Sequence, residues 1–255
     1  MNSISLEHFE HYSLLTIQRP QALNALNAEV FSEIDSVVSG KLPDSSRLLM
    51  VTGSGEKAFA AGADITEFTS LSGDQARELS RRGQIIFDKL ENYYLPTVAL
   101  VHGYALGGGL ELALSCQIRV LTKKAVLGLP ELNLGLLPGY GGTQRMPRLI
   151  GKGKALYYTL SSENMDAETA FRLGMGDFLV EGQEEGKAFI EKFALKLSGK
   201  SRVAAALAQE AILKSGDASG FELEANLFGQ AFQSEDMKEG VAAFLEKRKP
   251  VFRHS

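Results

Sequence analysis

Hydrophobic positions follow two different spacings along the first 150 residues. Short apolar runs of strand length lie at residues 13–18, 47–52, 98–101, 119–122 and 125–128. Between them, apolar residues recur every three or four positions, which predicts helices over residues 27–38, 74–92 and 108–115. This alternation of strands and helices indicates an α/β protein with largely parallel strand pairing.

The pattern changes in the last third of the chain, where it is nearly all helical from about residue 155. Asp166 is the expected N-cap of a helix that Gly174 ends. Further helices are expected over residues 184–197, 201–214, 220–232 and 235–247. We therefore predict an α/β core of residues 1–195 and a helical region of residues 196–255.

Composition narrows the classes of partner. The 255 residues are 44% hydrophobic and 23% charged, and the net charge of -4 gives no general attraction to nucleic acid or anionic membranes. No apolar run has the roughly 20 residues that span a bilayer, and no secretory signal pattern is visible. A single cysteine, Cys116, excludes an intramolecular disulfide, and no histidine has metal-ligand spacing with acidic residues. We expect a cytoplasmic protein with no metal and with neither nucleic acid nor a membrane as partner.

Two glycine-containing turns precede helical segments, at residues 61–64 and 107–109. Backbone N–H groups at a helix start lack intrahelical partners, and two that converge form an oxyanion hole. Taken alone, the glycines are explained as well by tight packing of strands against helices. Asp64, followed three residues later by Glu67, resembles a capping box with Asp in place of Ser or Thr.

Two glutamates are the candidate acid and base. Glu111 follows the second glycine turn among apolar residues, so burial is expected to raise its pKa; stabilisation of the helix start, worth about 0.3–1 kcal/mol, is the alternative. Glu131 is the only acid in an apolar segment, and the alternative is a solvated loop residue. His102 is expected to be structural, because no Gly-x-Ser-x-Gly elbow accompanies it.

The segments 58–65, 102–113 and 130–145 resemble the enoyl-CoA hydratase/isomerase (crotonase) family, and the similarity extends over residues 19–249. The resemblance implies a crotonase-like spiral of repeated strand-strand-helix units with a C-terminal helical trimerisation region. It implies homotrimers, or hexamers built as dimers of trimers. It also implies an acyl-CoA thioester substrate, whose coenzyme A moiety takes the place of any separate cofactor.

The same resemblance assigns roles to residues. Ala63 and Gly108 would bind the thioester oxygen through their N–H groups, while Glu111 deprotonates water and Glu131 protonates C2. Substrate-binding positions would be Ala61, Asp64, Ile65, Gly139, Phe228, Phe244 and Lys247. For Phe228 and Phe244, helix core or trimer contact remains an open alternative, and for Lys247 a solvated charge does. Tyr140 stands where alanine is common in the family and is expected to narrow the pocket.

Within the family, a chain with both glutamates resembles the 2-enoyl-CoA hydratases. The resemblance implies addition of water across the C2–C3 double bond of trans-2-enoyl-CoA to give 3-hydroxyacyl-CoA. The alternative within the family is Δ3,Δ2-enoyl-CoA isomerase or another acyl-CoA-processing enzyme. An alternative from another class is a protein of the same fold that binds RNA or a partner enzyme with little catalysis. The acidic charge balance and the lack of a basic stripe weigh against RNA.

Overall fold

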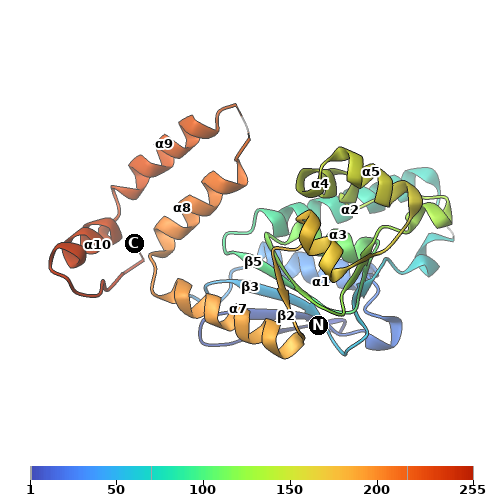
Figure 1. The fold of residues 1–255 in the computed structure, drawn as a ribbon, viewed down its shortest axis with the longest axis horizontal. Coiled ribbons are helices and arrows are strands. Elements are labelled where there is room, and N and C mark those ends of the chain that lie inside the picture. The colour runs from blue at the N-terminus through green and yellow to red at the C-terminus, as the bar shows by residue number, and fades with distance from the viewer. Residues whose placement is uncertain (1, 70, 217, 255) are drawn as a thin grey trace. The chain divides into compact units, whose positions relative to one another are not determined.

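The structure is a computed structural model that describes residues 2–69, 71–216 and 218–254. The chain divides into two compact units, Met1–Glu191 and Lys192–Ser255, called unit 1 and unit 2 below. Unit 1 contains all the strands of the described chain, and unit 2 is helical (Figure 1). Among the described residues, no helix is long and apolar enough to cross a membrane.

The larger sheet of unit 1 has six strands in the order β1-β2-β3-β5-β7-β10. They span Ile4–His8 (β1), Ser13–Ile17 (β2), Leu49–Gly53 (β3), Thr97–Val101 (β5), Ile118–Thr122 (β7) and Phe178–Val180 (β10). Only the β1–β2 pair is antiparallel within this sheet, so the expected parallel pairing is confirmed. The helical interpretation beyond residue 155 is wrong at β10, because a three-residue strand is too short to show a period.

The smaller sheet has the order β4-β6-β8-β9. Its strands span Ala58–Ala61 (β4), Tyr104–Leu106 (β6), Val126–Gly128 (β8) and Met165–Asp166 (β9). The first three are parallel to one another, and β9 is antiparallel to β8. Sequence patterning missed β4, β6 and β9, again because each is at most four residues long.

Helices surround these sheets. The α-helices that begin in unit 1 span Ala28–Ser39 (α1), Gly73–Glu91 (α2), Gly108–Ser115 (α3), Gly142–Ile150 (α4), Lys152–Ser161 (α5), Ala167–Leu173 (α6) and Gln183–Ser198 (α7). Short 3-10 helices cover Pro20–Ala22, Ile65–Phe68 and Glu131–Leu134. The Asn27 side chain accepts from the N–H of Val30, and Asp166 caps α6 by accepting from the N–H of Thr169, as the sequence predicts.

The capping box predicted at Asp64 and Glu67 is wrong. Asp64 makes no side-chain cap; its carboxylate accepts from Arg19 Nη2 at 3.0 Å and from Thr66 Oγ1 at 2.7 Å. Glu67 instead accepts from the N–H of Ala28 at 3.2 Å. Both carboxylates therefore bind residues far away in the sequence, Arg19 and Ala28, instead of capping a helix. Local spacing does not reveal such partners.

The core of unit 1 is apolar and contains the lone cysteine. Phe59 and Phe87 are among its largest fully buried side chains. Cys116 is buried as well, and burial raises the pKa of its thiol to about 12, which disfavours the reactive thiolate form. His102 is also buried, and desolvation lowers the pKa of its imidazole.

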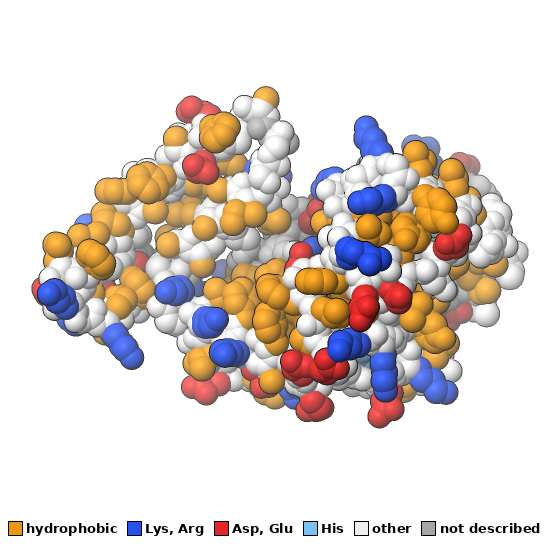
Figure 2. Space-filling model, in the orientation of Figure 1, with side chains coloured by type: hydrophobic (Ala, Val, Ile, Leu, Met, Phe, Trp, Pro, Cys, Tyr) orange, Lys and Arg blue, Asp and Glu red, His pale blue; other side chains and the backbone are white. Residues whose placement is uncertain are grey.

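Unit 2 contains three further α-helices, at the positions that the sequence predicts. They span Arg202–Leu213 (α8), Gly220–Ala231 (α9) and Glu235–Leu245 (α10), and α8 packs against α9. Several of its large apolar side chains are exposed: Ile212, Phe221, Phe228, Phe232, Val241, Phe244 and Leu245. Figure 2 shows apolar side chains gathered over these helices.

Candidate active site

Three parallel strands bring the candidate groups to one edge of the smaller sheet. The register pairs Ala61 of β4 with Leu106 of β6, and Leu106 with Gly128 of β8. The residues that follow each strand therefore leave the sheet side by side. Ligands of parallel sheets bind outside such carboxyl ends.

The residues that carry the two candidate amides, Ala63 and Gly108, lie close together at this edge. Gly108 begins α3, so its N–H lacks an intrahelical partner. A Cβ built on Gly108 would lie 3.5 Å from the nitrogen of Ala63. Leu26 binds the residues on either side of Ala63, through Gly62 O and the N–H of Asp64, both at 2.9 Å. Within the described part of the chain, neither amide donates to a protein acceptor, and their arrangement fits an oxyanion hole.

The other glycines of the second turn serve packing. A Cβ on Gly109 would lie 1.9 Å from the carbonyl oxygen of Ala60 in β4, so only glycine lets α3 approach this strand. Gly107 has a φ of 50°, and a Cβ there would lie 3.0 Å from Glu131 Oε1. Within this turn, Gly108 therefore fits the oxyanion-hole interpretation, and Gly107 and Gly109 fit the packing interpretation.

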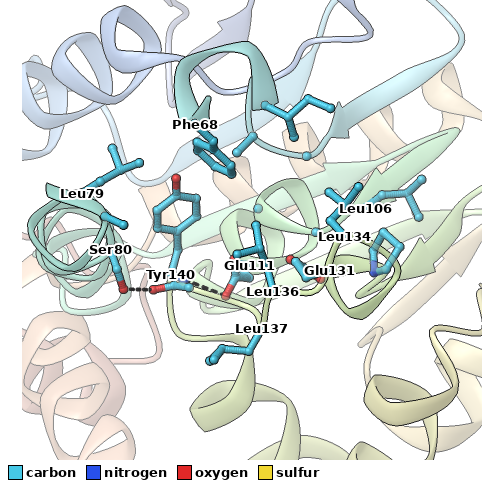
Figure 3. Close-up of a pocket in the computed structure, with 18 of the residues that line it drawn as sticks. Phe68, Leu79, Ser80, Leu106, Glu111, Glu131, Leu134, Leu136, Leu137 and Tyr140 are labelled. Atoms are coloured by element: carbon cyan, nitrogen blue, oxygen red, sulfur yellow. Dashed lines mark hydrogen bonds between the residues drawn. The ribbon is translucent and has the colours of Figure 1, made fainter. Parts of the chain in front are cut away.

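Glu111 is 1% exposed, and backbone amides bind one of its two carboxylate oxygens. Its Oε1 accepts from the N–H of Tyr140 at 2.8 Å (Figure 3). The same oxygen accepts from the N–H of Gly142 at 2.7 Å. Burial raises the pKa of this carboxyl, while the two amides and the charge of Arg145 oppose that rise. A base at this position is desolvated, yet its ionised form is hydrogen-bonded.

Glu131 begins the 3-10 helix after β8 and lies partly buried beside Glu111. Its Oε2 is buried without a hydrogen-bond partner among the described residues. Burial, and then the negative charge of Glu111, raise the pKa of Glu131 to about 7. Two carboxyls with different environments are the usual arrangement for one acid and one base.

Both carboxyls line a cavity of about 600 Å³, within the usual size range of ligand pockets. Five other residues named from the sequence line it too: Ala61, Ala63, Ile65, Gly108 and Gly139. Leu71 and Leu79 line it from the segment 71–84, which the sequence suggested as a source of pocket depth. Sequence reasoning missed a further apolar part of the wall, which includes Phe68, Leu106, Leu134, Leu136 and Leu137 (Figure 3). The sequence signal that could have indicated this wall is the group of three leucines within four residues, Leu134, Leu136 and Leu137.

Asp64 does not line this cavity, because Arg19 and Thr66 hold its carboxylate as described above. Phe228, Phe244 and Lys247 lie in unit 2, so their contacts with substrate stay predictions. Phe228 and Phe244 are 66% and 83% exposed, which rules out the helix-core interpretation within their own unit.

Tyr140 also lines the cavity. Its ring lies 4.9 Å from that of Phe31 and 6.0 Å from that of Phe87, centroid to centroid. A Cβ on Gly83 of α2 would lie 2.3 Å from the Tyr140 ring, and a Cβ on Gly108 of α3 would lie 3.2 Å from it. The absence of side chains at these two glycines therefore leaves room for the ring. In residues 2–69, 71–216 and 218–254, no group of three His, Cys, Asp or Glu side chains is placed to hold a metal ion.

Comparisons with known proteins agree with this geometry. The family model described as enoyl-CoA hydratase/isomerase matches residues 10–255. The chain is 43% identical to "Probable enoyl-CoA hydratase" of Bacillus subtilis, covering 99% of each chain. It is 41% identical to "Crotonyl-CoA hydratase" of Syntrophomonas wolfei and 40% identical to "Short-chain-enoyl-CoA hydratase" of Clostridium acetobutylicum, in both cases covering 98% of this chain and 97% of the relative.

A crystal structure of an enoyl-CoA hydratase from Bacillus anthracis superposes with a TM-score of 0.92 at 32% identity, covering 100% of both chains. The expected crotonase-like fold is therefore confirmed. Together with the full-length matches above, this shows that the chain belongs to the enoyl-CoA hydratase/isomerase family.

Proposed function

We propose that this chain is an enoyl-CoA hydratase, which adds water to short and medium trans-2-enoyl-CoA thioesters and releases 3-hydroxyacyl-CoA. The observation that carries the proposal is the pair Glu111 and Glu131 on one cavity wall, beside the amides of Ala63 and Gly108. The names of the relatives from Syntrophomonas wolfei and Clostridium acetobutylicum support this substrate class.

The amides would activate the thioester. Its carbonyl oxygen accepts from Ala63 and Gly108, and it gains negative charge as a nucleophile adds to C3. Donors already in place stabilise that charge without rearrangement, and losing one donor typically costs about 10²–10³ in rate. The amide positions thus set where C2 and C3 lie, next to the carboxyls.

The two carboxyls would move the protons. The amides of Tyr140 and Gly142 occupy Glu111 Oε1, so its other oxygen takes a proton from water as the new C3–O bond forms. The C2–C3 π electrons move onto the thioester oxygen as an enolate. Protonated Glu131 then donates to C2, the carbonyl reforms, and the proton held by Glu111 returns to Glu131 through solvent.

This arrangement favours hydration over isomerisation. An isomerase moves one proton between two carbons and needs one carboxylate, whereas two acids face this cavity. Glu131 has a pKa of about 7, so a large fraction is protonated at neutral pH. Glu111 has amide partners that favour its ionised form.

Hydration of crotonyl-CoA, followed by loss of enoyl-thioester absorbance, tests the proposal. We expect Glu111→Gln and Glu131→Gln each to lower kcat by about 10²–10⁴. Glu10→Gln is the matched control, because that side chain is 88% exposed, and it should leave kcat unchanged. Wild-type activity in both glutamine variants would refute the two-carboxyl mechanism. Conversion of a 3-enoyl-CoA without any hydration would favour the isomerase.

The proposal extends to assembly. Phe221, Phe244 and Leu245 of unit 2 are 89%, 83% and 74% exposed, and exposed apolar patches of this kind mark interfaces. A homotrimer, or a hexamer of two trimers, would cover them. Sedimentation equilibrium tests this, and a monomer at micromolar concentration would contradict it.

Contacts of Phe228, Phe244 and Lys247 with bound acyl-CoA belong to the same proposal. Lys247→Ala should raise KM for crotonyl-CoA and leave KM for a truncated thioester without phosphates unchanged. An equal change in both KM values would assign Lys247 a role other than phosphate binding.

A further inference from the structure

The turn that binds Glu111 is itself held from two sides. The carbonyl oxygen of Gly139 accepts from Ser80 Oγ at 2.6 Å and from Gln84 Nε2 at 3.0 Å, both on α2. The next carbonyl oxygen, that of Tyr140, accepts from Arg145 Nη1 of α4 at 3.0 Å. Consecutive carbonyls are therefore fixed by different helices.

Arg145 is anchored in turn by Glu91, near the end of α2. Its guanidinium is 7% exposed, and Nε donates to Glu91 Oε2 at 2.7 Å. A Cβ on Gly141 would lie 2.1 Å from Arg145 Nη1, and the φ of Gly141 is 110°. Only glycine permits this left-handed turn under a guanidinium.

The contacts of Arg145 and Glu111 alternate along three consecutive peptide units. Glu111 Oε1 binds the N–H groups of Tyr140 and Gly142, which belong to the first and third units. Arg145 binds the carbonyl oxygen of Tyr140, which belongs to the second unit and links the other two. Arg145 therefore holds in place the peptide unit that sets the spacing between the two donors to Glu111.

We propose that Arg145, anchored by Glu91, is a positioning residue for Glu111 that keeps one carboxylate oxygen bound and leaves the other for water. This inference rests on the proposed hydratase function. Arg145 acts through the backbone turn and touches no reacting atom. Glu91 acts one step further away, by setting the direction of the guanidinium.

Electrostatics adds to the geometry. The charged and titratable groups around Glu111 are Glu131 from the 3-10 helix after β8, the Tyr140 phenol and Arg145 from α4, with Glu91 and Arg148 behind Arg145. The positive charge of Arg145 lowers the pKa of Glu111, against burial that raises it. Without Arg145, the acidic limb of the pH–rate profile should therefore move to higher pH.

A purely structural role is the competing explanation, because the Glu91–Arg145 pair also joins α2 to α4. Arg148 allows the two to be separated. It pairs with the same Glu91, through Oε1 at 3.1 Å, but its side chain is 63% exposed. Its other bond in the described part of the chain is to the carbonyl oxygen of Gln144, outside the turn. Arg148→Gln therefore removes an ion pair to Glu91 without disturbing the carbonyl of Tyr140.

The test compares Arg145→Gln, Arg145→Lys and Glu91→Gln with Arg148→Gln in crotonyl-CoA hydration across pH. For Arg145→Gln we expect kcat to fall about 10²-fold, since a displacement of about 1 Å has that cost, with KM changed by less than about threefold. Its acidic limb should shift upward. Arg145→Lys keeps the positive charge but loses the planar guanidinium that binds Tyr140 and Glu91 together, so its kcat should fall without a shift of the acidic limb. Arg148→Gln should resemble the wild type.

A lower melting temperature of Arg145→Gln with wild-type kcat and an unmoved acidic limb would overturn the proposal. If Arg145→Gln does not fold, Glu91→Gln provides the test. We expect its kcat to fall about 10-fold, and a wild-type kcat in this variant would contradict the proposal. Isotope-edited infrared titration of the Glu111 carboxyl, with Glu111→Gln as blank, gives a readout without turnover. An inactive wild type would refute the hydratase, whereas an unchanged Glu111 titration in Arg145→Gln would refute the positioning role.

Discussion

Gly109→Ala should disable the site by adding a single methyl group. The new Cβ would lie 1.9 Å from the carbonyl oxygen of Ala60 and 2.5 Å from its carbonyl carbon, whereas ordinary contacts begin near 3.4 Å. The shortfall is about 1.5 Å, and the obstacle is backbone in a paired strand, which cannot turn aside. Helix α3 must therefore move away from β4.

Two magnitudes follow. Overpacking a tight interior typically costs about 1–3 kcal/mol, and replacing a helical glycine gains about 1 kcal/mol, so we expect net destabilisation of up to about 2 kcal/mol. Helix α3 carries both the amide of Gly108 and the carboxyl of Glu111. A shift of about 1 Å in these groups should lower kcat/KM about 10²-fold.

The assays are urea unfolding and crotonyl-CoA hydration of the folded protein. Gly153→Ala is the matched control, since Gly153 is also the second residue of its helix, and a Cβ there meets nothing within 4 Å. It should leave kcat/KM unchanged and raise the free energy of unfolding by up to about 1 kcal/mol. If Gly109→Ala behaves like this control, α3 does not need its close approach to β4.

Three further predictions concern other parts of the molecule. Tyr140→Ala should raise kcat/KM for an eight-carbon enoyl-CoA relative to crotonyl-CoA, because the ring lines the cavity beside Gly108; an unchanged ratio would mean that it does not bound the acyl site. Glu131 has a folded-state pKa of about 7, above its ordinary 4.5, so its contribution to stability is complete below pH 4.5 and lost as pH rises through 7. Glu131→Gln should therefore gain stability over the wild type on going from pH 5 to pH 8 in urea unfolding, and an equal difference at both pH values would contradict this. Asp166→Ala removes the N-cap bond of 2.7 Å to Thr169 and should cost about 1 kcal/mol in the same assay, with no change in kcat.

Sequence patterning located the long elements well and the short ones poorly. Helix α1 follows its predicted cap at Asn27, because both the cap and the apolar face are local signals. Strand β4 has four residues and β9 has two, and pairing with neighbouring strands decides their conformation. Local periodicity has too few positions in such strands to report it.

For the site, the sequence indicated which groups lie together and missed what holds them. Burial of Glu111 followed from its apolar neighbours, and the structure has it 1% exposed. The hydrogen bonds that Tyr140 and Gly142 donate to Glu111 join residues 29 and 31 positions apart. The Glu91–Arg145 pair joins residues 54 positions apart. No spacing rule links such partners, so only the folded chain reveals them.

The oxygen-binding donors that we propose at Ala63 and Gly108 belong to the main chain, which has a consequence for how such a protein changes over generations. Every amino acid except proline supplies an N–H, so point mutation rarely deletes these donors, provided that the strand ends stay in place. The carboxyls at 111 and 131, in contrast, can each be exchanged by a single codon change. Proteins with this fold can therefore keep the backbone donors that activate a thioester while the proton-transfer side chains change by mutation. New reactions can arise in this way without loss of thioester binding.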